Sequence, residues 1–80
     1  MNDIPEVGTI VYDKHSKETF RVIDTGIAST NGVRFASLLP ISGHLSEKKW
    51  GPLVLSLQYV ITHMEPDVFL TEVYKTNGRK

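Results

Sequence analysis

Short runs of alternating apolar and polar residues occupy the first half of the chain, and this pattern is typical of half-buried β-strands. Residues 8–12 are rich in β-branched and aromatic side chains, which favours a first strand. After a polar turn, residues 19–24 carry apolar side chains on both faces, with Phe20 on one and Ile23 on the other. A strand with two apolar faces is expected to be covered on both sides.

The Asn31-Gly32 pair is the strongest local signal in the sequence. Asn-Gly accepts the positive φ angles of a type I′ turn, which joins two neighbouring antiparallel strands. We therefore predict a tight hairpin whose second strand covers residues 33–39 and stops near Pro40. Its expected cross-strand pairs are Thr30 with Val33, Ser29 with Arg34, and Ala28 with Phe35.

Residues 53–61 form the most apolar stretch of the chain and allow two interpretations. Alternation over part of this stretch fits a strand. A helical turn that begins at a Ser56 N-cap and ends before Pro66 fits about as well, because Ser is a preferred N-cap residue. The pattern alone leaves open whether residues 53–64 are strand or helix. Residues 68–74 then predict a last strand.

Five short strands in meandering order predict a mainly β fold. We expect a small five-stranded SH3-like barrel or a strongly curled antiparallel sheet, with at most one short helical turn. Closure into a barrel hides the sheet edges, whereas an open sheet leaves an edge for a second copy of the chain. We expect a single small domain over residues 1–80, with an ordered core at 7–74 and flexible ends at 1–6 and 75–80.

Composition and charge limit the classes of partner and the cellular location that we expect. The 80-residue chain has no cysteine, so apolar packing must stabilise it, and the apolar faces of residues 19–24 and 53–61 lead us to expect a homodimer. Nine basic residues balance nine acidic ones, which removes the main cue for nucleic-acid binding. Residues 1–6 do not resemble a signal peptide and no stretch resembles a membrane span, so we expect a cytoplasmic protein with no membrane association.

Candidate residues for metal binding or catalysis are few. His63, Glu65 and Asp67 would share one face of an uninterrupted strand, but Pro66 breaks the run. The adjacent residues Ser42-Gly43-His44 lack the third group that orients a catalytic base. The glycines do not have the spacing of a phosphate-binding loop. We therefore expect no catalytic residue, no metal and no cofactor, and we favour a protein that is not an enzyme.

A binding surface is the more plausible interpretation of the polar loop at residues 42–52. There, two lysines precede the only tryptophan of the chain. Trp50 could anchor in a partner's pocket, or stack on a base whose phosphate the lysines neutralise. It could instead fold back and cap the core, which the small size of the domain favours. The candidate binding residues are Lys48, Lys49, Trp50 and His44 in the loop, and Arg34 on the strand after the predicted turn.

Two segments resemble the first part of MazF-like toxins, which are small-barrel ribonucleases. Gly8-Thr9-Ile10-Val11 is similar to the family's Gly-Asp-Ile-Val-type strand, and Pro40-Ile41-Ser42 to its Pro-Ile-Thr motif. Residues 19–24 lack the Arg-Pro pair that this family carries in its middle strand, and that basic residue belongs to the family's RNA chemistry. The resemblance implies a small-barrel fold and makes RNA cleavage the alternative function.

The sequence thus favours a non-enzymatic β-barrel binding module that recognises a protein or nucleic-acid partner through residues 42–52. Its size is compatible with an accessory protein of a mobile element or phage. A small-barrel ribonuclease of the MazF-like type is the alternative. A basic cleft with Arg or Lys beside Ser, Thr or His would favour the enzyme, and a flat surface with an exposed Trp50 would favour the module.

Overall fold

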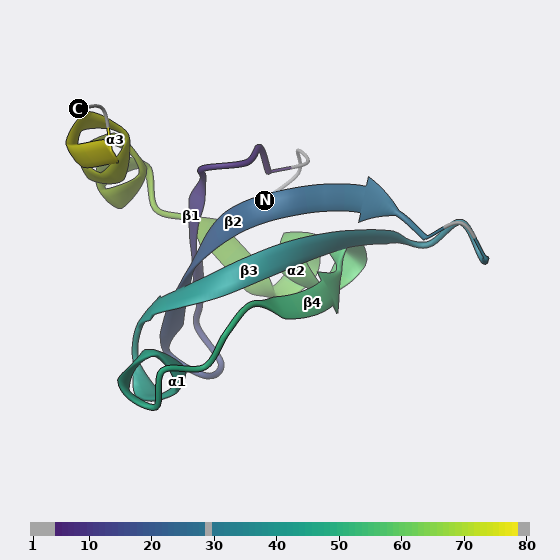
Figure 1. Ribbon diagram of the computed structural model, residues 1–80, viewed down its shortest axis with the longest axis horizontal. Helices are drawn as coiled ribbons and strands as arrows, with labels where there is room; N and C mark the ends of the chain where they lie inside the picture. The colour runs from purple at the N-terminus through teal and green to yellow at the C-terminus, as the bar shows by residue number, and fades with distance from the viewer. Residues whose placement is uncertain (1–4, 29, 79–80) are drawn as a thin grey trace.

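Strands dominate the first part of the fold and helices the last. The computed structural model describes residues 5–28 and 30–78, with the backbone alone at His44 and at residues 75–78. The elements in chain order are β1 (Ile10–Asp13), β2 (Glu18–Ile27), β3 (Arg34–Ser42), α1 (His44–Glu47), β4 (Leu53–Ser56), α2 (Leu57–His63), β5 (Met64–Pro66) and α3 (Val68–Gly78). Figure 1 shows α3 to one side of the sheet, beyond β1.

The five strands form one antiparallel sheet in the order β4-β3-β2-β1-β5. The first four strands therefore form a meander, and β5 returns to the far edge to pair with β1. In Figure 1, β1 crosses the direction of β3, so the sheet is strongly twisted. The prediction of a mainly β, five-stranded antiparallel fold is confirmed, but β4 and β5 are not hydrogen-bonded to each other and the sheet is not closed into a barrel.

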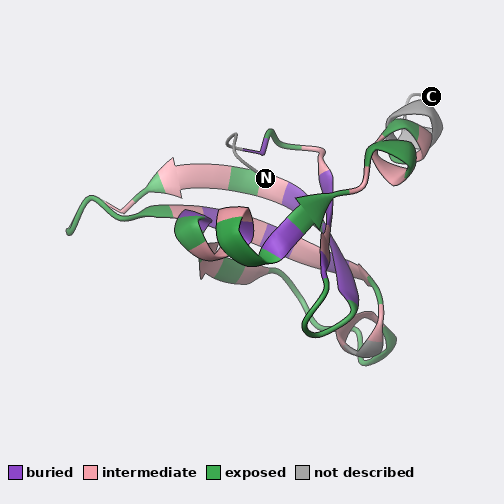
Figure 2. Cartoon of the chain, turned by 180° about the vertical axis from the view of Figure 1, so that it is seen from behind, coloured by how far each residue is buried: buried purple, intermediate pink, exposed green. Residues whose placement is uncertain are grey.

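The hydrophobic core lies between the sheet and α2. We call the sheet face that α2 covers the inner face. Because side chains alternate along a strand, every second residue of β3 points to this face, including the fully buried Ala36 and Leu38. Figure 2 shows the buried segments concentrated in the middle of the sheet and on α2. The cluster consists of Val11, Phe20, Val22, Ala36, Leu38, Leu57, Val60 and Met64.

Both interpretations of residues 53–61 are partly right, because the chain changes from strand to helix at Ser56. The Ser56 hydroxyl oxygen accepts a hydrogen bond of 3.2 Å from the backbone N–H of Tyr59, which is the predicted N-cap interaction. From that point the 3.6-residue period places Leu57 and Val60 against the sheet, where both are buried. The local cap therefore ends β4 and begins α2.

The predicted last strand at residues 68–74 is wrong, since these residues belong to α3. Asp67 Oδ1 accepts a hydrogen bond of 2.9 Å from the Leu70 N–H, and this cap favours a helix despite the β-branched composition that follows. The fifth strand is Met64–Pro66 instead, and Pro66 fits there because β5 is an edge strand. The prediction of at most one short helical turn is also wrong, because the described residues contain three helices.

The β2–β3 hairpin exists, but its turn and register differ from the prediction. Ile27 lies opposite Arg34 and Gly26 opposite Phe35, and the Ala28 N–H donates to the Val33 carbonyl at 2.8 Å. All three predicted pairs are therefore wrong, although Ser29 itself lies outside the described residues. Because Ala28 is bonded to Val33, the connection is longer than the two residues of a type I′ turn.

The conformation of Asn31 explains this longer loop. Gly32 has a φ of +72°, but Asn31 does not have the positive φ that a type I′ turn requires. Its side-chain Oδ1 instead accepts a hydrogen bond of 2.9 Å from the Val33 N–H, a local bond that asparagine commonly makes in turns.

The β1–β2 loop has the same construction. There the Lys17 N–H donates to the Asp13 carbonyl at 2.7 Å, just as the Gly32 N–H donates to the Ala28 carbonyl at 2.8 Å. Lys17 also has a positive φ, of 60°. Both hairpin loops therefore end on a left-handed residue, which is glycine in one loop and lysine in the other.

None of the helices in the described ranges has both the length and the apolar character needed to cross a membrane.

Candidate binding site

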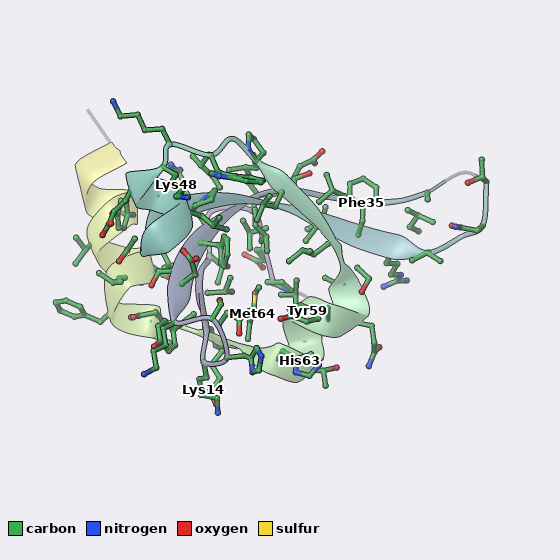
Figure 3. The ribbon with its side chains drawn as sticks, turned by 90° about the horizontal axis from the view of Figure 1, so that it is seen from below. Lys14, Phe35, Lys48, Tyr59, His63 and Met64 are labelled. Atoms are coloured by element: carbon green, nitrogen blue, oxygen red, sulfur yellow. The ribbon has the colours of Figure 1, made fainter. Side chains whose placement is uncertain are left out.

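The five predicted binding residues do not form one site. Arg34 begins β3, whereas Lys48, Lys49 and Trp50 follow α1, after β3 has ended. β3 has nine residues, and at about 3.4 Å per residue it separates the two groups by roughly 27 Å. Figure 3 accordingly places Lys48 at the opposite end of the sheet from Phe35, the neighbour of Arg34. The side chain of His44 lies outside the described residues.

A buried carboxylate holds the loop at residues 42–52 against the sheet. Glu18, the first residue of β2, is only 6% exposed, and its Oε1 accepts a hydrogen bond of 3.0 Å from the Leu45 N–H in α1. Gly43 permits this approach, because a Cβ at that position would lie 2.5 Å from Glu18 Oε1. Gly43 also has a φ of +113°, which disfavours any other residue. Glu18 and Gly43 together fix the direction in which α1 leaves the sheet.

A C-terminal cap fixes the other end of α1. The Trp50 N–H donates to the Leu45 carbonyl at 3.1 Å, and the Lys49 N–H donates to the Ser46 carbonyl at 3.0 Å. These two bonds define a Schellman motif, in which the residue before the last donor is left-handed and is usually glycine. Lys49 occupies that position with a φ of +58°. The motif brings Trp50 back to Leu45, which packs partly against the core.

Trp50 is nevertheless exposed, with 53% of its surface accessible. The interpretation in which it folds back as part of the core is therefore wrong. Lys48 and Lys49 beside it are exposed as well, as are Gly51 and Pro52. The loop thus presents a large aromatic side chain between two lysines and a proline, on a backbone that two sets of hydrogen bonds hold in place.

Arg34 lies instead beside a cavity of about 360 Å³ between the β2–β3 hairpin and α2. The remaining residues that line it are Val33, Ser56, Leu57, Gln58 and Ile61. No sequence pattern predicted this cavity, because one of its walls is α2, and the pattern left open whether those residues are strand or helix. Arg34 itself was among the candidate binding residues, but for a partner on the distant loop.

The possible metal ligands near β5 have other partners. Glu65 Oε1 accepts a 2.8 Å hydrogen bond from the Lys14 ammonium, which lowers the pKa of Glu65 and raises that of Lys14. Asp67 caps α3, and the His63 ring lies 4.6 Å from the Tyr59 ring, centre to centre. Across residues 5–28 and 30–78, no three side chains of the metal-binding types come together.

A buried polar cluster that the sequence analysis missed joins α2 to the β1–β2 loop. Asp13 is 4% exposed. Its Oδ1 accepts from the His15 N–H at 2.9 Å, and its Oδ2 accepts from the Tyr59 hydroxyl at 3.0 Å. Burial opposes ionisation of Asp13, but the hydrogen bonds from His15, Tyr59 and Ser16 outweigh it, so its pKa lies below the ordinary value. The hydrogen bond to Asp13, together with burial, raises the pKa of Tyr59.

The fold and the site define a small domain with a twisted antiparallel sheet and a rigidly held, tryptophan-bearing loop. No protein-family model, no curated protein and no solved structure matches the chain. The function is therefore inferred from the geometry of the site itself.

Proposed function

We propose that this domain is a non-enzymatic binding module that binds a protein partner, with Trp50 as the anchor and Lys48 and Lys49 at its rim. The observation that carries the proposal is the exposure of Trp50, at 53%, on a loop whose two ends are hydrogen-bonded to the rest of the fold. Tryptophan is enriched among the residues that dominate binding energy. A loop that is already ordered loses less entropy when a partner binds.

The charge of the chain favours a protein over a nucleic acid as this partner. Phosphate contacts dominate nucleic-acid affinity and require a surplus of basic residues, but nine basic and nine acidic residues balance here. In the loop itself, Glu47 offsets one of the two lysines that follow it. A partner with an apolar pocket and an acidic rim fits Trp50 and this modest positive charge better than a polyanion does.

A MazF-like ribonuclease is the second candidate, because the cavity beside Arg34 also contains Ser56. An Arg or Lys beside a Ser, Thr or His is the feature that we expect of the ribonuclease. RNA cleavage also needs a general acid and a general base. The described residues around the cavity contribute no histidine and no carboxylate, so the cavity is better suited to binding than to catalysis.

Three further features are proposed for the same module. The arrangement of the strands is that of an SH3-like barrel left open between β4 and β5, which is supported by the way α2 directly joins these two edge strands. The module is a homodimer, which is supported by apolar side chains on α3, where Val68 is 70% and Phe69 76% exposed. Its cytoplasmic location stays a prediction from the sequence.

The test compares what the wild-type protein and two variants capture from a cell lysate treated with nuclease. Trp50→Ala should weaken binding of the captured protein by about 2 kcal/mol and leave folding stability nearly unchanged. Val54→Ala is the matched control, because Val54 is also an exposed hydrophobic residue, at 65%, but lies on β4. Binding of the purified partner should shift the emission of Trp50, the only tryptophan, to shorter wavelength.

Two results would contradict the proposal. Equal loss of the captured protein in Trp50→Ala and Val54→Ala would show that the loop has no special role. A fluorescence titration with a twelve-residue oligothymidylate that quenches Trp50 at micromolar concentration would make the partner a nucleic acid. Separately, cleavage of a labelled RNA by the wild-type protein, lost in Arg34→Gln, would favour the ribonuclease.

A further inference from the structure

The β2–β3 hairpin extends beyond the helix that covers the sheet, as Figure 1 shows for the ends of β2 and β3 relative to α2. Directly opposed residues of an antiparallel pair point to the same face. Thr25 lies opposite the buried Ala36, and Ile27 lies opposite Arg34, so all four belong to the inner face. Ala36 is covered, but Ile27 is 60% exposed. The core therefore ends partway along the hairpin. In the part of the hairpin nearest the turn, the inner face is not covered.

Two cavities lie on this uncovered face and share two residues. The larger, of about 360 Å³, faces α2 and is lined by Leu57 and Ile61 of that helix. The smaller, of about 160 Å³, lies beside Thr25 and Ile27 of β2. Arg34 and Leu57 line both cavities, so these two residues stand where the cavities meet.

The charge of Arg34 has no counterpart among the described residues that line these cavities, which are otherwise apolar or uncharged. The nearest acidic residue of β2, Asp24, lies opposite Ser37 and so faces away from the inner face. A guanidinium group keeps its charge and binds carboxylates through two parallel hydrogen bonds. A ligand that fits here combines an anionic group with aliphatic surface.

We propose that the cavity pair at Arg34 binds the C-terminus of a peptide that ends in an aliphatic residue. In such a residue the carboxylate and the aliphatic side chain leave the same carbon atom, which matches an arginine and a leucine that line the same two cavities. The last side chain occupies the cavity against Leu57 and Ile61, and the carboxylate faces Arg34. The hydroxyl of Ser56 and the amide of Gln58 at the same cavity provide hydrogen bonds for the peptide backbone. Capture of a free C-terminus is a recurrent mode of peptide recognition.

The shape and chemistry of the cavities argue against other anionic ligands. Single-stranded nucleic acids bind by stacking bases on aromatic rings, and no aromatic side chain lines either cavity among the described residues. A volume of about 360 Å³ lies at the small end of the 300–1,000 Å³ range of ligand sites, roughly, and suits one or two side chains. This site is separate from Trp50, at the other end of β3, and does not depend on the function proposed for the loop.

The probe for the test is the peptide acetyl-Ser-Ala-Val-Leu with a free carboxylate, titrated into the isotope-labelled 80-residue chain. The backbone amide signals of Arg34, Leu57 and Ile61 should shift. The same peptide with a C-terminal amide should bind about tenfold more weakly, because a charge-assisted hydrogen bond is lost. This comparison uses the wild-type protein and does not depend on how any variant folds.

Variants then assign the effect to one side chain. Arg34→Gln should lower the affinity for the free carboxylate about tenfold, to that of the amide, and leave the affinity for the amide unchanged. Arg21→Gln is the matched control, because Arg21 is also an exposed arginine of the sheet but lies outside both cavities. Trp50→Ala should leave peptide binding unchanged, which keeps the two proposed sites distinguishable.

Several results would overturn the proposal. Equal affinity for the carboxylate and the amide would exclude recognition of the charge. Shifts confined to residues 45–52 would place the peptide on the other surface, and no shifts at millimolar peptide would remove the site. Competition by inorganic phosphate at equal concentration would make it a general anion site.

Discussion

The hydroxyl of Tyr59 on α2 donates a hydrogen bond of 3.0 Å to the carboxylate of Asp13, where β1 ends. The bond joins residues that are 46 positions apart in the chain. The same carboxylate accepts the backbone N–H of His15 and so also shapes the β1–β2 loop. One buried acid therefore connects the covering helix, the first strand and the first hairpin.

Removal of the Tyr59 hydroxyl should make the domain less stable at neutral pH and less sensitive to acid. Tyr59→Phe leaves Asp13 with one partner fewer, so we expect a loss of about 1–2 kcal/mol in the free energy of unfolding at pH 7. Urea unfolding measures it. Tyr12→Phe is the control, because the Tyr12 hydroxyl makes no hydrogen bond within the described part of the chain.

The pH dependence follows from the direction of the pKa shifts. Because the pKa of Asp13 is lower in the folded state, its contribution is complete above its unfolded pKa of about 3.9 and is lost as the pH falls through the folded value. Because the pKa of Tyr59 is raised in the folded state, its contribution to stability is complete below its unfolded pKa of about 10. That contribution is lost as the pH rises through the folded value. If the free energy of unfolding fell with decreasing pH in the same way in the wild type and in Tyr59→Phe, this account would be contradicted.

The two hairpin loops predict opposite effects of exchanging glycine. Gly32→Val should lower stability by about 1 kcal/mol or more, because a β-branched residue resists a positive φ. Lys17→Gly, at the matching position of the other loop, should raise stability by roughly 0.5–1 kcal/mol because it relieves the same strain. Thermal unfolding measures both. A loss of stability in Lys17→Gly would show that its side chain matters more than its backbone.

Gly26 and Phe35 are predicted to be energetically coupled. They lie opposite each other on the outer face of the hairpin, and a Cβ on Gly26 would lie 2.7 Å from the Phe35 ring. Gly26→Ala should therefore cost about 1–3 kcal/mol with Phe35 present, and much less in a Phe35→Leu background. A double-mutant cycle with urea unfolding measures the coupling. Additive effects would mean that the ring moves aside freely.

The proposed homodimer predicts association that depends on α3. Sedimentation of the wild-type protein should show a dimer at high micromolar concentration, and Phe69→Ser should shift it to monomer, because Phe69 is the most exposed apolar residue on α3. Ile27→Ser, on the opposite part of the molecule, is the control and should remain dimeric. A monomeric wild type under these conditions would exclude the dimer.

Sequence patterns predicted best those features that depend on interactions between residues close together in the chain. The helix that begins at Ser56 follows from one side chain and its neighbour three positions later, and both lie within the predicted segment. Asn31-Gly32 located the hairpin but not its register, because the Asn31 side chain binds the Val33 N–H and lengthens the loop. Residues 68–74 have the composition of a strand, but the Asp67 side chain caps them as a helix instead.

The binding residues were harder to predict than the secondary structure, because their arrangement depends more on tertiary structure. The spacing of Lys48, Lys49 and Trp50 predicted a surface, but their exposure depends on Glu18, which comes from β2 and lies 27 residues before its partner Leu45. Arg34 was recognised as a candidate and assigned to the wrong surface. Its cavity requires α2 to lie against the hairpin, and no local pattern contains that information.

The pairing of β5 with β1 has a consequence for how the domain folds. Val11 and Pro66 are paired although more than fifty residues separate them, so this contact closes a long loop, at an entropic cost that must be met before the contact stabilises anything. The β1–β2–β3 meander involves much shorter loops and is expected to assemble first, with the pairing of β5 with β1 as the slow step. During synthesis, β1 therefore keeps one edge unpaired until β5 has left the ribosome.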